Sequence, residues 1–384
     1  MSEHEAERGR VSTLELFFDL VFVFTVSQLT TVLVEDPHAG GVVHAALLFG
    51  LIWWMFNGYV WLTNELPPTT DRRRVLLFAA MAGFLTMALA LPEAFNEGDG
   101  AKVFAAGYML VTVVHAGLFS RTSSAEASRA ITRLAPFNLA GAALVMVGAF
   151  THGRTQSALW LGALVIEAAA PRLGGRLAGF TIRPAHFVER HGLIIIIALG
   201  ESLIAIALGA AGLPIDASLI AVAVVTLGVA ACLWWVYFRV DIERAEQALF
   251  HECATQRAVV ALNAYNYAHI PLLLGVVTFA AGVKKAAAHP LDHATTAGAL
   301  YVAAGIALYL CGHAVFRRTL HLGGPWLRLA TSAAVLATVP IGVYGAALAQ
   351  LAVVLLLLCL CATLDPRVAT RRVRRAEPAG PSRT

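Results

Sequence analysis

The chain has few charged residues, and its basic residues are almost all arginine. Asp, Glu, Lys and Arg make up 14% of its 384 residues, whereas a soluble globular domain carries about 25%. Lysine occurs only at positions 102, 284 and 285. No polar stretch is long enough to fold by itself, and this excludes a separate soluble domain.

Several signatures of enzymes and metal sites are also absent. The five cysteines lack paired spacing of the zinc or redox type, so we expect them to be reduced and structural. The sequence has no phosphate-binding loop, no His-Glu-x-x-His and no Gly-x-Ser-x-Gly, and its histidines show no metal-ligand spacing on one helix face. We therefore expect no cofactor and no metal, assign no catalytic residue, and favour a protein that is not an enzyme.

Long apolar segments fill most of the chain. Hydrophobic residues make up 58% of it and the mean hydropathy is +0.72. The apolar residues fall in runs of about 20, long enough for a helix to cross a bilayer. The pattern predicts an all-α polytopic transmembrane bundle of about twelve helices, near 13–33, 41–63, 75–95, 102–120, 134–152, 156–171, 192–212, 216–238, 258–282, 296–316, 326–342 and 344–364.

The arginines and lysines predict how this bundle is oriented. Cytoplasmic loops carry the excess of basic residues, and with the N-terminus inside, 24 of the 28 basic residues fall in cytoplasmic segments. We expect an even number of helices, two cytoplasmic termini and no cleaved signal peptide. The chain then divides into an N-terminus (1–12), a first six-helix half (13–171), a charged cytoplasmic loop (172–191), a second six-helix half (192–364) and a basic tail (365–384).

The basic tail contains the sequence RRVRR at residues 371–375. We interpret it as a topology anchor that contacts anionic lipid headgroups, and not as a nucleic-acid-binding segment. The lipid bilayer and these headgroups are the partners that the sequence predicts, and it leaves the oligomeric state open.

The two halves share features that favour parallel repeats of six helices. The first and seventh predicted helices each carry an acid near their start and a polar group twelve residues further on, Glu15 with Ser27 and Glu189 with Glu201. The second and eighth each contain a Trp-Trp pair, at 53–54 and 234–235. Such repeats occur in transporters with sites between the halves, although apolar helices also resemble one another by chance.

Two acids in the first apolar run are candidates for function. Glu15 and Asp19 are four residues apart, so they share one face of a helix. A carboxylate inside a membrane costs about 2.5 kcal/mol or more. Glu15 also completes a capping box with Ser12. Asp19 lies too deep for a cap, and either pairs structurally with an arginine on another helix or lines a path for a proton, ion or solute.

Glu201 is the deepest of the acids. It lies about 13 Å beyond Gly192 along a helix, close to the middle of the membrane. Ser202 beside it offers a hydroxyl group, and no basic residue lies within the same span. A glutamate in that position suits proton transfer, and the alternative is a neutral, hydrogen-bonded structural residue. We place Glu201 and Ser202 with Glu15 and Asp19 along the predicted ion or substrate path.

A cluster of ionisable residues precedes the seventh predicted helix. It comprises His186, Glu189, Arg190 and His191. Histidine titrates near neutral pH, so the cluster is a candidate cytoplasmic entrance to the path. The alternative is a solvated loop with local ion pairs, each worth less than about 1 kcal/mol.

Three segments together resemble the bacterial low temperature requirement protein A (LtrA) family. They read LELFFDLVFV at residues 14–23, HFVERHGL at 186–193 and LGES at 199–202, and the hydropathy of the whole chain also fits. The resemblance implies a multi-pass membrane protein connected with growth in the cold, but it implies no particular activity. It assigns the signature residues to Glu15, Phe18, Asp19, His186, Glu189, Arg190, Gly192, Gly200 and Glu201, and gives His191 no special role.

These observations favour a transporter or channel in the inner membrane of a bacterium. The path would run between the first and seventh helices and carry a proton, a cation or a small solute. One alternative is a membrane enzyme acting on lipid or a lipid-linked group, with His186, Glu189 and Arg190 as acid, base and headgroup clamp. Another is a non-catalytic sensor or scaffold for cold adaptation.

Overall fold

The structure, a computed structural model, describes residues 11–120, 122, 125–173, 180–239 and 241–376. These residues form helices and turns without any strand. Eleven of the helical segments are long and apolar enough to cross a membrane. The predicted all-α transmembrane bundle is therefore confirmed, and the chain is a multi-pass membrane protein. The cytoplasmic location of the two termini stays a prediction.

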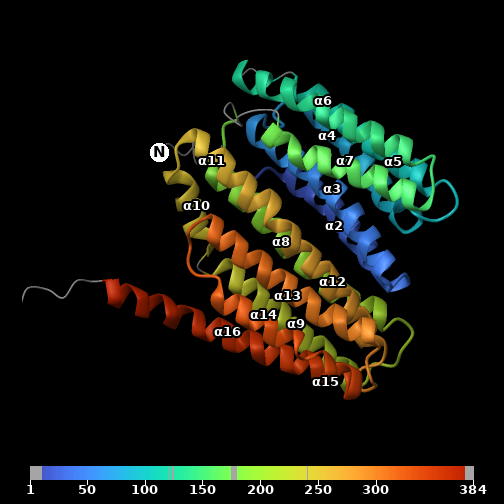
Figure 1. The fold of residues 1–384 in the computed structure, drawn as a ribbon, viewed down its shortest axis with the longest axis vertical. Helices are drawn as coiled ribbons and strands as arrows, with labels where there is room; N and C mark the ends of the chain where they lie inside the picture. Colours follow the sequence, from blue (N-terminus) through green and yellow to red (C-terminus); the bar gives the residue numbers. More distant parts are fainter. Residues whose placement is uncertain (1–10, 121, 123–124, 174–179, 240, 377–384) are drawn as a thin grey trace, which may run out of the picture.

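The helices are arranged in two groups with two helices between them (Figure 1). Helices α2–α7 gather on one side, helices α9, α13, α14 and α16 gather on the other, and α8 and α12 lie between. The bounds are α2 (Thr13–Glu35), α3 (Ala39–Glu65), α4 (Asp71–Ala90), η1 (Leu91–Glu93), α5 (Gly100–Phe119), α6 (Ala125–Gly148), α7 (Gly153–Leu173), α8 (Pro184–Gly209), α9 (Ala217–Phe238), α10 (Asp241–His251), α11 (Ala254–Ala261), η2 (Leu262–Tyr267), α12 (His269–Ala288), α13 (Thr296–Thr319), α14 (Trp326–Leu336), α15 (Val339–Tyr344) and α16 (Ala347–Ala376).

Short polar side chains begin several of these helices. Each accepts a hydrogen bond from the backbone N–H three residues further on, which satisfies a donor that the first helical turn leaves free. The caps of this kind are Ser12, Thr70, Asp216 and Thr295.

Helix α8 begins earlier than the sequence predicts. Its first residue is Pro184, a residue type suited to the first helical turn, so part of the segment 172–191 predicted as a loop is helical. His186 and Arg190 of this segment find buried partners, described below, and this allows the helix to start inside the protein. His186 and Arg190 thereby face the core and not solvent.

Two further predicted helices differ from expectation. The sixth is present as α7, but the polar residues Arg154, Glu167 and Arg172 lower its hydropathy, and it is not among the eleven candidate spans. The predicted helix 326–342 is divided into α14 and α15.

The predicted helix 258–282 contains a π-helical turn, η2, between α11 and α12. The N–H of Ala268 donates to the carbonyl of Asn263, five residues back, at 3.1 Å. This turn leaves backbone carbonyls free, and side chains use them. Trp53 Nε1 donates to the Asn266 carbonyl at 2.8 Å, and His269 Nδ1 lies 2.8 Å from the carbonyl oxygen of Ala264. Such π turns are frequent at functional sites, and this one directs His269 into the core.

The two Trp-Trp pairs that favoured a repeat lie in different surroundings. Trp53 and Trp54 are 0% and 8% exposed, whereas Trp234 and Trp235 are 41% and 44% exposed. The pairs therefore do not occupy equivalent positions in the bundle, and the six-helix repeat stays a prediction.

Candidate functional site

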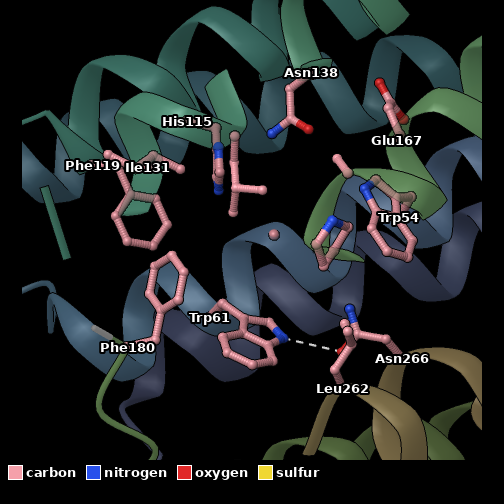
Figure 2. A pocket seen from close by; sticks show the side chains of 14 residues that line it. Trp54, Trp61, His115, Phe119, Ile131, Asn138, Glu167, Phe180, Leu262 and Asn266 are labelled. Carbon is pink, nitrogen blue, oxygen red and sulfur yellow. Dashed lines mark hydrogen bonds between the residues drawn. The ribbon is translucent and has the colours of Figure 1, made fainter. Parts of the chain in front are cut away.

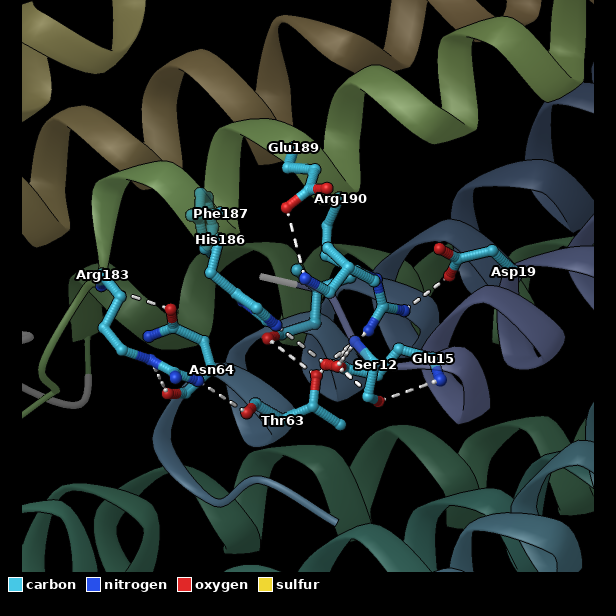
Figure 3. A network of polar contacts seen from close by, with 12 residues as sticks. Ser12, Glu15, Asp19, Thr63, Asn64, Arg183, His186, Phe187, Glu189 and Arg190 are labelled. Atoms are coloured by element: carbon cyan, nitrogen blue, oxygen red, sulfur yellow. Dashed lines mark hydrogen bonds and ion pairs between the residues drawn. The ribbon is translucent and has the colours of Figure 1, made fainter. Parts of the chain in front are cut away.

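A buried cluster of four ionisable side chains joins α2 to α8 (Figure 3). It consists of Glu15, Asp19, His186 and Arg190, and we call it the α2–α8 cluster. Arg190 Nη1 lies 3.0 Å from Glu15 Oε1, and Arg190 Nη2 lies 2.5 Å from Asp19 Oδ1. His186 Nε2 lies 3.0 Å from the same oxygen of Glu15. Each of the four side chains is at most 3% exposed.

The spacing of these residues explains how they meet. Glu15 and Asp19 are four residues apart on α2, and His186 and Arg190 are four apart on α8. Residues at this spacing lie on one helix face, one turn apart. Helix α2 therefore presents two acidic side chains on one face, and α8 presents two basic ones. The acidic pair lies opposite the basic pair when the two helices pack side by side.

Glu15 serves as both cap and ion-pair partner. Its Oε2 accepts hydrogen bonds from the backbone N–H of Ser12 at 2.9 Å and from the Ser12 hydroxyl at 2.8 Å. Its Oε1 accepts from Arg190, which also donates to Thr63 Oγ1 of α3 at 3.1 Å. The capping box predicted from the sequence is present, and the other oxygen of the carboxylate is free to bind α8.

Asp19 adopts the structural alternative, because it pairs with an arginine of another helix. Both acids of α2 thus lie beside Arg190 in a buried environment, and not on an open surface. The geometry gives no support to the expectation that Glu15 and Asp19 line a path. None of the four cavities characterised in the described part of the chain is lined by either acid.

The predicted entrance residues do not act as one group. His186, Arg190 and His191 are buried, whereas Glu189 is exposed and accepts a hydrogen bond from the N–H of Val11 at 3.2 Å. Figure 3 shows Glu189 next to Arg190 on α8, with its carboxylate group directed toward the chain just before Ser12. His191 Nε2 lies 3.1 Å from Asn57 Oδ1 of α3. The segment is part of the packed interior, with one acid facing outward.

Glu201 lies in different surroundings from the α2 acids. It is 0% exposed, its Oε2 accepts a hydrogen bond from the Ser27 hydroxyl of α2, and its Oε1 has no hydrogen-bond partner among the described residues. Lys284 of α12 is close enough for its charge to act on Glu201, without a direct contact. Ser202 does not bind it, because its hydroxyl donates to the Leu199 carbonyl at 2.7 Å. Glu201 is therefore a buried acid that no arginine holds.

A second buried charge cluster, which the sequence reasoning missed, lies among α10, α13, α14 and α16. Arg317 Nη1 lies 2.8 and 2.7 Å from the two carboxylate oxygens of Asp241, and His313 Nε2 lies 3.2 Å from one of them. Arg328 donates to His313 Nδ1 at 2.7 Å and pairs with Asp365 at 3.0 Å. The sequence did contain a pattern that could have indicated this cluster, because His313-x-x-x-Arg317 has the same spacing as His186-x-x-x-Arg190.

A row of buried rings runs from His191 of α8 to His313 of the second cluster. His191 and His269 have ring centroids 5.4 Å apart, and Tyr237 Oη donates to His269 Nε2 at 2.9 Å. The Tyr237 and His313 rings follow at 5.8 Å. All four side chains are at most 1% exposed. This polar row joins the two central helices, α8 and α12, to α9 and α13 of the second group.

A cavity of about 70 Å³ lies between α3, α5, α6, α7 and η2 (Figure 2). Its walls include Trp54, Trp61, Phe119 and Phe180. Glu167 also lines it and is 0% exposed; Tyr108 donates to one of its oxygens at 2.5 Å. The other oxygen has no hydrogen-bond partner within the described residues. Glu167 is thus a second buried acid without a bound arginine.

The described residues contain no group of three His, Cys, Asp or Glu side chains arranged to hold a metal ion. The chain matches the model of the family described as bacterial low temperature requirement A protein (LtrA) over residues 10–363. The chain belongs to the LtrA family. The match spans nearly the whole LtrA chain, and it includes both charge clusters apart from Asp365, together with Glu201. An uncharacterised protein of Rhizobium meliloti (strain 1021) is 29% identical over 330 residues, which are 81% of this LtrA chain and 78% of that protein. No solved structure matches the chain.

Proposed function

We propose that this LtrA protein moves a proton, another cation or a small solute across the inner membrane of a bacterial cell, and that Glu201 is the carboxyl group that binds the moving species. The observation that carries the proposal is the isolation of Glu201. It is fully buried on α8, one of its oxygens accepts a hydrogen bond from the Ser27 hydroxyl, and the other lacks a hydrogen-bond partner among the described residues.

The cost of an acid in a membrane explains why this isolation points to function. A charged side chain at the centre of a transmembrane helix costs about 2.5–3.5 kcal/mol. Glu15 and Asp19 offset that cost with Arg190. Glu201 has a neutral partner, the Ser27 hydroxyl, and a lysine, Lys284, whose charge acts on it without forming an ion pair. A carboxyl in that position gains and loses a proton or cation more readily than one held by a guanidinium group.

The α2–α8 cluster supports this role from a distance. Arg190 and Glu201 lie on the same face of α8, about three turns apart. Ion pairs between Arg190 and α2 fix how the two helices face each other, and the contact between Ser27 and Glu201 lies further along the same pair of helices. The cluster is therefore a positioning element, and Glu201 with Ser27 is the candidate binding element.

The enzyme alternative loses the residue group on which it depended. Arg190 and His186 are buried and paired with Glu15, whereas Glu189 is exposed and accepts a hydrogen bond from the N–H of Val11. The acid and the headgroup clamp that this alternative requires are therefore already occupied by Glu15. The sensor or scaffold alternative does not require a charge at Glu201. A variant in which Glu201 is neutral therefore distinguishes this alternative from transport.

Flux into proteoliposomes tests the proposal. Purified protein is reconstituted with a pH-sensitive dye inside the vesicles, and uptake of protons, K⁺ and Na⁺ is measured under an imposed gradient. Glu201→Gln keeps the shape and a hydrogen bond to Ser27, and we expect its flux to fall to the level of protein-free vesicles. Glu35→Gln, at an exposed acid of α2, is the matched control and should behave like the wild type. Wild-type flux in Glu201→Gln refutes the role of Glu201, and absence of any wild-type flux favours a sensor or scaffold.

A further inference from the structure

A second cavity, of about 370 Å³, lies where the first turns of α6 meet α11 and the segment before α8. Three arginines line it, Arg129 and Arg133 from α6 and Arg257 from α11, together with one acid, Glu126. Its volume falls in the range of about 300–1,000 Å³ that is usual for small-ligand sites. Three guanidinium groups and one carboxylate give the cavity an excess of positive charge.

Arg257 is held in place without losing its charge. Its guanidinium donates to the carbonyls of Leu249, Phe250 and Glu252 at 2.8, 3.0 and 2.9 Å, at and just beyond the end of α10. Carbonyl groups are neutral, so these bonds orient the side chain but leave its full positive charge. Arg133 is exposed and forms no ion pair with another described residue. An anion that enters the cavity therefore meets at least two guanidinium groups that no carboxylate has neutralised.

The cavity lies at the edge of the membrane-spanning part of the protein. The candidate span of α6 begins at Glu126, so Arg129 and Arg133 occupy its first two turns. Further along the same helix, Leu139 and Val147 are 43% and 54% exposed and face the surroundings of the bundle. By the distribution of basic residues, this edge is the predicted cytoplasmic side, where anionic lipids attract clustered arginines.

The wall of this cavity continues into the apolar cavity of Figure 2. Phe180 lines both, and in the figure it lies opposite Phe119 at one end of the aromatic cavity. A ligand in the arginine cavity therefore has charged groups on one side and an aromatic, apolar region next to it. That arrangement matches an amphiphile better than a freely soluble anion.

We propose that this cavity binds the headgroup of an anionic phospholipid, with the phosphate at Arg133 and Arg257 and the chains along α6. Guanidinium groups bind phosphate through paired, charge-assisted hydrogen bonds. The site is separate from Glu201 and does not rest on transport. The side chains of residues 371–375 in the basic tail lie outside the described residues, and the proposal does not use them.

Binding of fluorescent phosphatidylglycerol to the full-length protein in a zwitterionic detergent tests this proposal. Both lipids carry the phosphate, but the choline group of phosphatidylcholine brings a positive charge beside the arginines, and such like-charge contacts weaken binding. We therefore expect the wild type to bind phosphatidylglycerol at least about tenfold more tightly than phosphatidylcholine. Arg133→Gln should weaken phosphatidylglycerol binding about tenfold, because it removes a charge-assisted hydrogen bond to the phosphate. Arg133→Lys, which keeps the charge but not the paired geometry, should fall between the two.

Two controls make the result decisive. Arg318→Gln removes an exposed arginine from the end of α13 and should bind like the wild type. Arg257 also anchors the end of α10, so Arg133 carries the test and thermal unfolding confirms that its variants are folded. Equal binding by Arg133→Gln and Arg318→Gln, or equal binding of the two lipids, overturns the site. Glycerol 3-phosphate binding as tightly as phosphatidylglycerol overturns the lipid assignment in favour of a soluble anion.

Discussion

Replacing Arg190 by methionine should destabilise the protein more than any change at an exposed arginine. Arg190 is 1% exposed and pairs with Glu15 and Asp19 at 3.0 and 2.5 Å. Removing one partner of a buried ion pair leaves an uncompensated charge and costs about 3–5 kcal/mol. The two acids do not share this loss equally. Glu15 retains His186 and Ser12, whereas Asp19 has no other partner among the described residues.

This asymmetry predicts which second change restores stability. In the Arg190→Met background, Asp19→Asn should recover most of the lost free energy of unfolding, and Glu15→Gln should recover less. The measurement is unfolding in mixed micelles as the fraction of SDS increases, followed by circular dichroism. Arg318→Met, at an exposed position, is the control. The reasoning is refuted if Arg190→Met unfolds at the same SDS fraction as Arg318→Met, or if Glu15→Gln restores more stability than Asp19→Asn.

Two further predictions concern residues outside the cluster. The sulfur atoms of Cys232 on α9 and Cys359 on α16 are 3.6 Å apart. Oxidation with copper phenanthroline should therefore join them in a disulfide, which a non-reducing peptide map detects in the wild type and not in Cys232→Ser. Absence of the linked peptide from the wild type contradicts this packing of α9 against α16. Asp216 caps α9, and hydrogen bonds from the backbone of Leu219 and the hydroxyl of Ser218 hold its pKa below its usual range. The cap therefore stabilises the protein above the unfolded-state pKa of about 3.9, and this stabilisation is lost as the pH falls through the lower folded-state pKa. The wild type should have a higher thermal unfolding temperature than Asp216→Ala at neutral pH, and the difference should shrink in acid. A difference that grows in acid contradicts the proposed role of the cap.

The architecture follows from the sequence because its cause is local. A run of about 20 apolar residues can satisfy its backbone in a bilayer only as a helix, so spans such as α2, α9 and α16 are visible in composition alone. The start of α8, in contrast, could not be predicted from composition. Its first turns carry His186, Glu189 and Arg190, and charged residues read as loop unless their partners on α2 are known.

The sequence predicted the candidate site only in part, because only some of its features are local. The sequence predicted that Asp19 and Glu201 lie within the membrane-spanning part of their helices, because depth depends only on distance along a helix. It could not show which of them is neutralised, because the neutralising group belongs to another helix. Arg190 is 171 residues from Asp19, and no local pattern connects the two. The cluster around Asp241 stayed hidden for this reason, although the spacing of His313 and Arg317 matched that of His186 and Arg190.

Under the proposed function, the partner of each buried acid matters more than the number of buried acids. Asp19 and Asp241 are held by guanidinium groups at 2.5 and 2.7 Å, and such pairs fasten helices together. Glu201 and Glu167 are buried as completely, yet each is held by a hydroxyl, from Ser27 and Tyr108. A hydroxyl can donate to a carboxylate and can accept from a carboxylic acid, so it accommodates both protonation states, whereas a guanidinium group stabilises only the charged one. Under the proposed function, that difference separates the acids that hold this bundle together, such as Asp19, from Glu201, the acid proposed to bind the moving species.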